Sequence, residues 1–154
     1  MKDSKGRGIA DDRRYEIEDF LGNRCFYVTH QPVLLGALEE VLRRLPIEVL
    51  ETLAHDRDLR VIFPERVANY VYRHDAITPR SSKMQSKSMW FVVLADYLNQ
   101  SSHGKAVGAI AHEFAHVILE QRGFESRLSE EEEAKADDLA SRWGFASEVI
   151  ESKK

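Results

Sequence analysis

Apolar residues in the first half of the chain recur at the three- and four-residue spacing of amphipathic helices. Pro32 can occupy the first turn of one such helix, and Pro46 is expected to end it and to open a second. Their apolar positions are Leu34, Leu38, Val41, Leu42 and Leu45, then Ile47, Leu50, Leu53 and Ala54. Ahead of them, residues 1–14 are polar and glycine-containing and predict a mobile tail, whereas residues 15–29 are expected to dock on the core.

Two compact apolar runs predict β-strands. Residues 59–63 (LRVIF) are rich in β-formers and stop at Pro64, and residues 89–94 (MWFVVL) predict a strand that is covered on both faces. The stretch 65–79 is ambiguous, because its apolar spacing fits either a helix or strands. Residues 77–88 are basic, rich in serine and free of acids, which is typical of a loop.

A longer apolar pattern predicts one helix over residues 105–122, with Gly123 just past its end. At about 100° per residue, most of its apolar side chains gather on one side of the helix. His112 and His116 fall together on the opposite side. The two histidines are therefore separate from the apolar stripe that faces the core.

The length, the net charge and the cysteine count indicate which classes of protein the chain can belong to. The length of 154 residues suits one domain, which we expect to span residues 15–150. A net charge of −4 gives no electrostatic case for nucleic acid or a membrane. No signal peptide or apolar run of transmembrane length is visible, so we expect a cytoplasmic protein. The single cysteine, Cys25, cannot form an internal disulfide and fits a reducing compartment.

His112, Glu113 and His116 form the pattern H-E-x-x-H. Histidines four residues apart can reach one ion, and zinc takes nitrogen ligands at about 2.0–2.1 Å in a tetrahedral arrangement. Glu113 points about 100° away around the helix, which suits contact with a metal-bound water rather than with the metal. The small residues Gly108 and Ala109, one turn earlier, are expected to leave space above this site.

A third ligand is expected on the next helix, which the capping-box pair Ser129 and Glu132 begins and Gly144 ends. The connecting loop is short, so the two helices are expected to be antiparallel neighbours. Glu133 and Asp137 share one face of this second helix. We expect Glu133 to be the third ligand, with Glu132 as its main rival. Asp137 is expected to accept the outer ring N–H of a ligating histidine.

The run HEFAH, followed seventeen residues later by EAKAD, resembles the gluzincin metallopeptidases, whose pattern is H-E-x-x-H followed by E-x-x-x-D. The small size resembles minimal zincin domains of the ImmA/IrrE type, over residues 89–145. The resemblance implies an α+β fold, in which a small sheet packs on the histidine-bearing helix and the following glutamate-bearing helix closes the site. It also implies one Zn²⁺ per chain, with ligands His112, His116 and Glu133, catalytic base Glu113 and supporting residue Asp137.

These features predict a zinc-dependent metallopeptidase that hydrolyses a peptide or protein substrate by a metal-activated water, with Glu113 as general base. The strand at 89–94 resembles the zincin edge strand along which an extended peptide lies. The alternative is a non-catalytic, metal-binding regulatory or interaction domain that retains the zincin site. A nucleic-acid binder that uses Arg80, Lys83 and Lys87 is the least favoured hypothesis.

No residue stands out as the group that stabilises the transition state. A tyrosine, histidine or arginine is expected in that role by the resemblance. The candidates are Tyr70, Tyr72, His74, Tyr97 and His103. The sequence does not distinguish among them, nor does it indicate the substrate.

Overall fold

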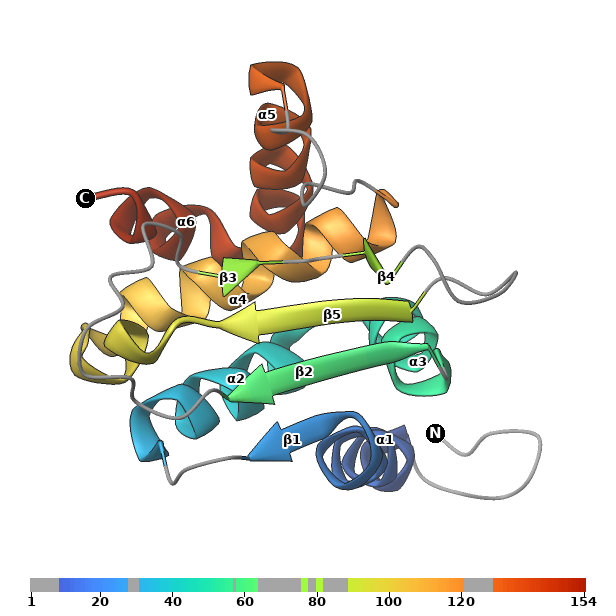
Figure 1. Ribbon diagram of the computed structural model, residues 1–154. Coiled ribbons are helices and arrows are strands. Elements are labelled where there is room, and N and C mark those ends of the chain that lie inside the picture. Colours follow the sequence, from blue (N-terminus) through green and yellow to red (C-terminus); the bar gives the residue numbers. More distant parts are fainter. Residues whose placement is uncertain are drawn as a thin grey trace.

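A five-stranded mixed sheet forms one layer of the computed structural model, and several of the helices lie against it (Figure 1). The described residues are 9–27, 31–56, 58–63, 76–77, 80–81, 89–120 and 129–154. The strands are β1 (Cys25–Tyr27), β2 (Leu59–Phe63), β3 (Ala76–Ile77), β4 (Arg80–Ser81) and β5 (Met89–Leu94). β1, β2 and β5 are parallel neighbours, whereas β3 and β4 both run antiparallel to β5. This combination of helices and a sheet agrees with the expected α+β class, and helices make up the larger part.

Strand β5 lies inside the sheet and not at its edge. Val93 has a partner on each side, Ile62 of β2 and Ile77 of β3. The expectation that residues 89–94 form an edge strand was therefore wrong. Strand β3 falls in the stretch 65–79, whose apolar spacing was ambiguous, whereas β4 falls in residues 77–88, which were expected to form a loop. The expectation of a loop was therefore wrong at Arg80–Ser81, where the chain pairs with β5. Among the described strands, β3 and β4 form the edge beside β5, and β3 also contacts helix α4 (His103–Ile118).

Helix α1 (Ile9–Asn23) begins inside the segment that was expected to be a mobile tail. The Arg13 guanidinium donates hydrogen bonds to the carbonyl oxygens of Arg43 at 2.9 Å and Leu45 at 2.8 Å. These bonds tie the start of α1 to the end of another helix, so residues 9–14 do not belong to a tail. Residues 1–8 of the expected tail lie outside the described residues.

Helices α2 (Pro32–Arg44) and α3 (Ile47–His55) confirm the roles predicted for the two prolines. Pro32 occupies the first position of α2, and Pro46 is the N-cap of α3. The apolar sides of both helices are buried in the core, with Leu34, Leu38, Leu42, Leu50 and Leu53 at most 1% exposed. None of the helices in the described residues is both long enough and apolar enough to cross a membrane.

The helix that bears the histidines has different ends from those predicted. Helix α4 follows the 3-10 turn at Asp96–Gln100 and starts two residues earlier than expected, because the Ser102 side chain caps it by accepting a hydrogen bond from the Lys105 amide. It ends at Ile118, four residues early. Glu120 has a φ of 53°, a left-handed conformation that cannot continue the helix. Gly123, predicted to end the helix, lies outside the described residues.

Three segments complete the chain: α5 (Glu130–Ala140), a π-helical turn (Ser141–Phe145) and α6 (Ala146–Ser152). The predicted capping box at Ser129 is confirmed, and Gly144, with a φ of 97°, turns the chain where α5 was expected to end. Helix α6 was not predicted and extends two residues past the expected domain boundary.

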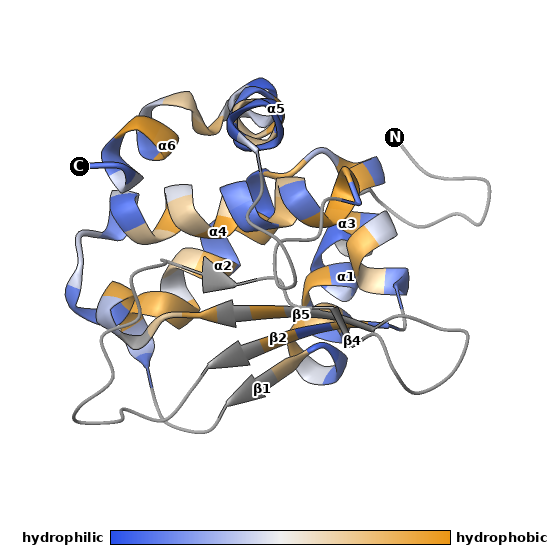
Figure 2. Cartoon of the chain, turned by 45° about the horizontal axis from the view of Figure 1, so that its top comes forward, coloured by the Kyte–Doolittle hydropathy of each residue, from blue (hydrophilic) through white to orange (hydrophobic). Residues whose placement is uncertain are grey.

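Helix α5 does not run antiparallel alongside α4, as was expected. It stands out from α4 at a steep angle, and most of its surface is hydrophilic (Figures 1 and 2). Only Ala136 and Ala140 of α5 are buried. The reason lies in α6, which packs closely on α4 at Gly108 and so occupies the surface that an antiparallel α5 would need.

Candidate metal centre

Helix α4 places His112 and His116 one turn apart on the side that faces α5. Their Nε2 atoms are 2.9 Å apart, and the two rings meet edge to face, with centroids separated by 4.5 Å. His116 is 2% exposed, and the side chain of His112 is 13% exposed. The four-residue spacing thus brings both imidazoles to one point, as predicted from the sequence.

Glu133 reaches the same point from α5. Its Oε2 lies 3.0 Å from Nε2 of His112 and 3.7 Å from Nε2 of His116. Hydrogen bonds with the imidazoles of His112 and His116 hold the pKa of the Glu133 carboxyl far below its usual range. The carboxylate is therefore ionised at neutral pH and available as an oxygen ligand.

The separations of the three candidate ligand atoms are close to those of ligands around a tetrahedral zinc ion. Tetrahedral ligands at about 2.0–2.1 Å from the ion lie about 3.3–3.4 Å from one another. Here the three separations are 2.9, 3.0 and 3.7 Å, on either side of that value. Such a triangle has a circumscribed radius of about 1.9 Å, so a point on either side of its plane lies about 2.0–2.1 Å from all three atoms. The described residues could therefore hold a metal ion without a change in the backbone.

Glu113 completes the cluster without sharing the position of the other three. It offers a carboxylate oxygen in a group in which the selected ligand atoms of His112, Glu113 and His116 all lie within 4.8 Å of one another. Glu113 is 9% exposed and sits about 100° around the helix from His112. This position is suited to contact with a molecule that itself contacts the ion.

Asp137 lies one turn after Glu133 and accepts a hydrogen bond from Nδ1 of His112 at 2.8 Å. The bond was predicted from the shared helix face. Nδ1 of His112 thereby keeps its proton, and Nε2 is directed toward Glu133 and His116. The other carboxylate oxygen of Asp137, Oδ2, accepts a hydrogen bond from Nζ of Lys153 at 2.5 Å. Sequence reasoning missed Lys153, because the helix that brings it here was not predicted.

Glu132, the rival for the third ligand, is engaged in the capping box. Its carboxylate accepts a hydrogen bond from the Ser129 amide at 2.8 Å, and the Ser129 hydroxyl accepts one from the Glu132 amide at 3.2 Å. Both interactions lie at the start of α5. The structure thus brings Glu133, and not Glu132, to the histidines.

Gly108 does not leave open space above the site, as had been expected. A Cβ atom at this position would lie 2.0 Å from the carbonyl oxygen of Glu148 in α6. The absence of a side chain at Gly108 allows the backbone of α6 to pack directly against α4.

The proposed transition-state groups are not gathered at the cluster in the part of the chain that is described. His103 bonds to Glu40 at the far end of α4, about 13 Å along the helix axis from His112 at about 1.5 Å per residue. Tyr97 packs on the core, and Nζ of Lys105 lies 6.0 Å from its ring centroid. Tyr70, Tyr72 and His74 lie outside the described residues, as do Lys83, Lys87 and the side chain of Arg80.

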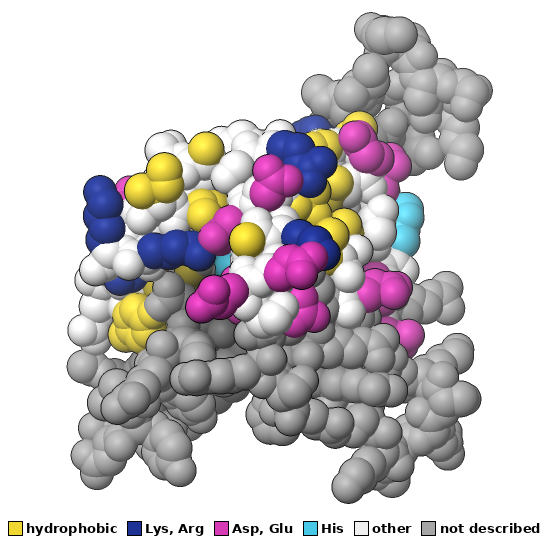
Figure 3. All heavy atoms as spheres, turned by 90° about the horizontal axis from the view of Figure 1, so that it is seen from above, with side chains coloured by type: hydrophobic (Ala, Val, Ile, Leu, Met, Phe, Trp, Pro, Cys, Tyr) yellow, Lys and Arg dark blue, Asp and Glu magenta, His cyan; other side chains and the backbone are white. Residues whose placement is uncertain are grey.

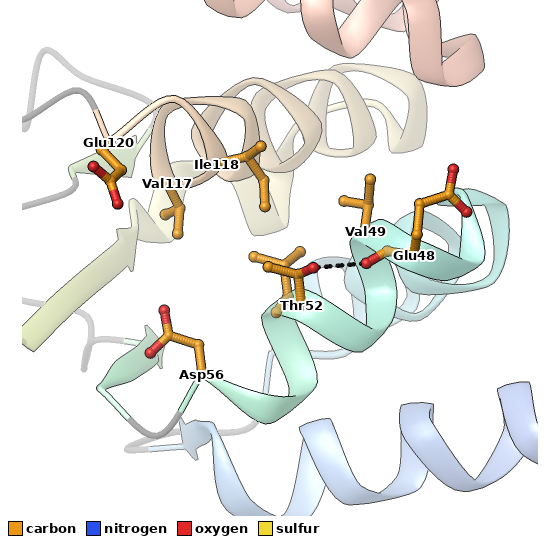
Figure 4. Close-up of a pocket in the computed structure, with 8 residues that line it drawn as sticks. Glu48, Val49, Thr52, Asp56, Val117, Ile118 and Glu120 are labelled. Atoms are coloured by element: carbon orange, nitrogen blue, oxygen red, sulfur yellow. Dashed lines mark hydrogen bonds between the residues drawn. The ribbon is translucent and has the colours of Figure 1, made fainter.

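A pocket of about 300 Å³ lies elsewhere, between α3 and the C-terminal end of α4 (Figure 4). Val49, Val117 and Ile118 are among its apolar lining residues, and its acids are Glu48, Asp56 and Glu120. None of its lining residues belongs to the metal cluster. Val117 and Ile118 point toward α3, whereas His116 points toward α5, so the pocket and the cluster are on different sides of α4.

Seen from above, charged side chains lie next to a small area of histidine, and a second, larger area of histidine lies toward the right edge (Figure 3). Acidic side chains gather over the exposed part of α5, and basic side chains lie beside them. The side chains of His112 and His116 are themselves largely buried, at 13% exposure for the His112 side chain and 2% for His116.

Comparison of the chain with protein-family models, with curated proteins and with solved structures gave no match.

Proposed function

We propose that the protein is a zinc-dependent metallopeptidase of the gluzincin type, which hydrolyses peptide bonds. The observation that carries this proposal is the meeting of Nε2 of His112, Nε2 of His116 and Oε2 of Glu133 from two different helices, with separations of 2.9 to 3.7 Å. Two nitrogens and one carboxylate oxygen favour zinc over the harder magnesium and calcium ions. Three protein ligands also leave the fourth position for a water or a substrate, as in catalytic zinc sites.

A zinc ion held by these atoms would lower the pKa of its bound water to about 7 and polarise a substrate carbonyl. Glu113 is the general base in this proposal. Its carboxylate accepts the proton of the attacking water and returns a proton to the amine that leaves. The location of Glu113 beside the imidazoles, at 9% exposure, supports this role.

The remaining residues of the cluster hold the ligands in the required form. Asp137 keeps a proton on Nδ1 of His112, which leaves the lone pair of Nε2 for the ion. The burial of His116 at 2% exposure restricts its ring to one orientation. A purely structural metal site would not need an additional carboxylate at Glu113, which favours a catalytic role over a regulatory domain that retains only the metal.

We place the substrate along the outer edge of β3. This strand contacts α4 and is an edge strand among the described part of the sheet, so an extended peptide can pair with its backbone. Backbone pairing would give binding with little selectivity for side chains.

The test combines metal analysis with a Glu113→Gln variant. The protein is purified without added zinc, its metal content is measured, and cleavage of a broad peptide library is followed. We expect about one zinc per chain in both wild type and Glu113→Gln, and a 10²–10⁴-fold loss of activity in the variant. Glu130→Gln is the matched control, because Glu130 is an exposed glutamate in the first turn of α5.

Two outcomes would contradict the proposal in different ways. A Glu113→Gln variant that cleaves at the wild-type rate would remove Glu113 from the role of base. A wild type that holds zinc, cleaves no peptide in the library and binds a partner equally well with or without Glu113 would favour the non-catalytic regulatory domain.

A further inference from the structure

The carboxylate of Asp137 is shared between two partners. Oδ1 accepts a hydrogen bond from Nδ1 of His112 at 2.8 Å, and Oδ2 accepts one from Nζ of Lys153 at 2.5 Å. The side chain of Asp137 is 29% exposed and that of Lys153 is 50% exposed. A continuous chain of contacts therefore runs from the C-terminal end of α6 to a ring at the centre of the metal cluster.

We propose that Lys153 is a positioning residue for the metal centre, an inference that rests on the proposed zinc site. Lys153 holds Oδ2 of Asp137, so that Oδ1 remains directed at Nδ1 of His112. Without the ammonium group, this partly exposed carboxylate is free to rotate and to exchange its contact with the imidazole for contact with water. His112 would then lose the bond that fixes its ring orientation and its tautomer.

Lys153 can serve this purpose because α6 is anchored along α4 at several points. The Glu148 carbonyl lies against Gly108, where no side chain intervenes. The Ser102 hydroxyl, at the start of α4, bonds to Glu151 at 2.5 Å. Lys153 is the C-cap residue of α6, and its amide bonds to the carbonyl of Ile150. The lysine therefore starts from a backbone that is fixed relative to the helix that bears His112.

Long-range electrostatics and a positioning role predict opposite changes in zinc affinity when Lys153 is replaced by an uncharged residue. A positive charge repels a divalent cation, so its removal on general grounds would strengthen zinc binding slightly. If Lys153 orients Asp137, its removal weakens zinc binding instead. The sign of the effect therefore separates the two explanations.

The experiment compares Lys153→Met and Lys153→Arg with the control Lys135→Met. Lys135 is also on the surface and also pairs with a carboxylate, Glu131 of α5, at 2.6 Å, away from the histidines. Zinc affinity is measured by competition with a chelating dye at constant pH and ionic strength. The melting temperature of each zinc-free protein reports on the fold, and the NMR signal of the His112 Nδ1 proton is recorded in the zinc-loaded protein.

For Lys153→Met we expect zinc affinity to fall about 3–10-fold, less than the roughly 10–100-fold cost of losing a residue that itself supports the ligand. The His112 Nδ1 proton signal broadens through faster exchange with water. Lys153→Arg restores both, because it keeps a charged donor at this position. Lys135→Met binds zinc as tightly as wild type or slightly more tightly, and the melting temperatures of the zinc-free proteins stay close to that of wild type.

Equal zinc affinity in wild type and Lys153→Met would overturn the role of Lys153 and leave the metal site intact. The same fall in Lys135→Met would also overturn it, since the effect would not depend on Asp137. A wild type that binds no zinc would refute the proposed function, and the role of Lys153 with it.

Discussion

The contact between Gly108 and α6 makes a prediction that can be worked from the coordinates. Replacement of Gly108 by Ala would place a Cβ atom 2.0 Å from the carbonyl oxygen of Glu148, 2.4 Å from its carbonyl carbon and 2.9 Å from the amide nitrogen of Val149. All three are backbone atoms, so no side chain can rotate away to relieve the contact. Helix α6 must instead move by about 1 Å or more, to reach the separation of about 3.3–3.6 Å at which carbon and oxygen atoms ordinarily meet.

Two effects of opposite sign determine how much the free energy of unfolding changes in Gly108→Ala. Alanine in a helix interior is favoured over glycine by about 1 kcal/mol, which stabilises the variant. Overpacking of a well-filled contact costs about 1–3 kcal/mol, and this contact involves backbone on both sides. Gly36 in α2 provides the matched control, because an added Cβ there meets no heavy atom within 4 Å. We expect Gly36→Ala to gain up to about 1 kcal/mol and Gly108→Ala to be less stable than Gly36→Ala by about 1–3 kcal/mol.

Urea unfolding followed by circular dichroism measures both variants under the same conditions. The zinc affinity of Gly108→Ala is measured alongside, since a shift of α6 also displaces Lys153 from Asp137. If Gly108→Ala were as stable as Gly36→Ala, the close approach of α6 to α4 would not exist in solution.

Three further predictions concern the proposed zinc ligand His116, the supporting residue Asp137 and the ion pair between Arg44 and Glu148 of α6. His116→Ala should lose the metal. It should also lose the roughly 2.7 kcal/mol of folding stability that a ligand gives at one hundred times its Kd, so added zinc should raise the melting temperature of wild type only. Equal metal content in both proteins would refute the site. Asp137→Ala should keep the fold and bind zinc about 10–100-fold more weakly, and complete loss in this variant with retention in Glu133→Ala would exchange the two roles. Arg44→Met should lose about 1–3 kcal/mol at pH 7, because Arg44 bonds to Glu148 at 2.6 Å and holds the pKa of that carboxyl below its usual range. A depressed pKa gives stability that is present above the unfolded pKa of about 4.3 and is lost as the pH falls through the folded value, so the difference from wild type should narrow in urea unfolding below about pH 4; an unchanged difference there would contradict the ion pair.

The parts of the site that the sequence predicted all depend on local spacing. His112 and His116 are four residues apart on one helix, and so are Glu133 and Asp137 on the next. A regular helix turns such spacing into a shared face without any knowledge of the rest of the fold. The capping box is local in the same sense, because it depends only on Ser129 and on Glu132 three residues later. This spacing alone predicts that the Glu132 side chain lies at the start of α5.

The parts that the sequence did not predict depend on contacts between distant segments. Strands β3 and β4 are two residues each and are strands only because they pair with β5. Two residues are too few to show the alternation of apolar and polar side chains that predicts a strand. Helix α6 has seven residues and is held by Gly108, about forty residues earlier in the chain. A glycine inside a helix does not show from the sequence alone which neighbouring backbone packs against it, and this is why the space beside Gly108 was expected to be open.

The geometry of α5 explains how a short contact between two helices can define the whole cluster. Glu133 and Asp137 are one turn apart, and side chains at this spacing lie about 5–6 Å from each other. They contact the two nitrogens of a single ring, Nε2 and Nδ1 of His112, at 3.0 and 2.8 Å. The two carboxylates therefore hold the imidazole of His112 from both sides. A short, steep contact between α5 and α4 is enough to form these two hydrogen bonds, because both are made to one ring. A displacement of α5 along its own axis would disturb both contacts together, so the proposed ligand Glu133 and its support Asp137 depend on the same helix position. Helix α6 bears on this position through the bond from Lys153 to Asp137.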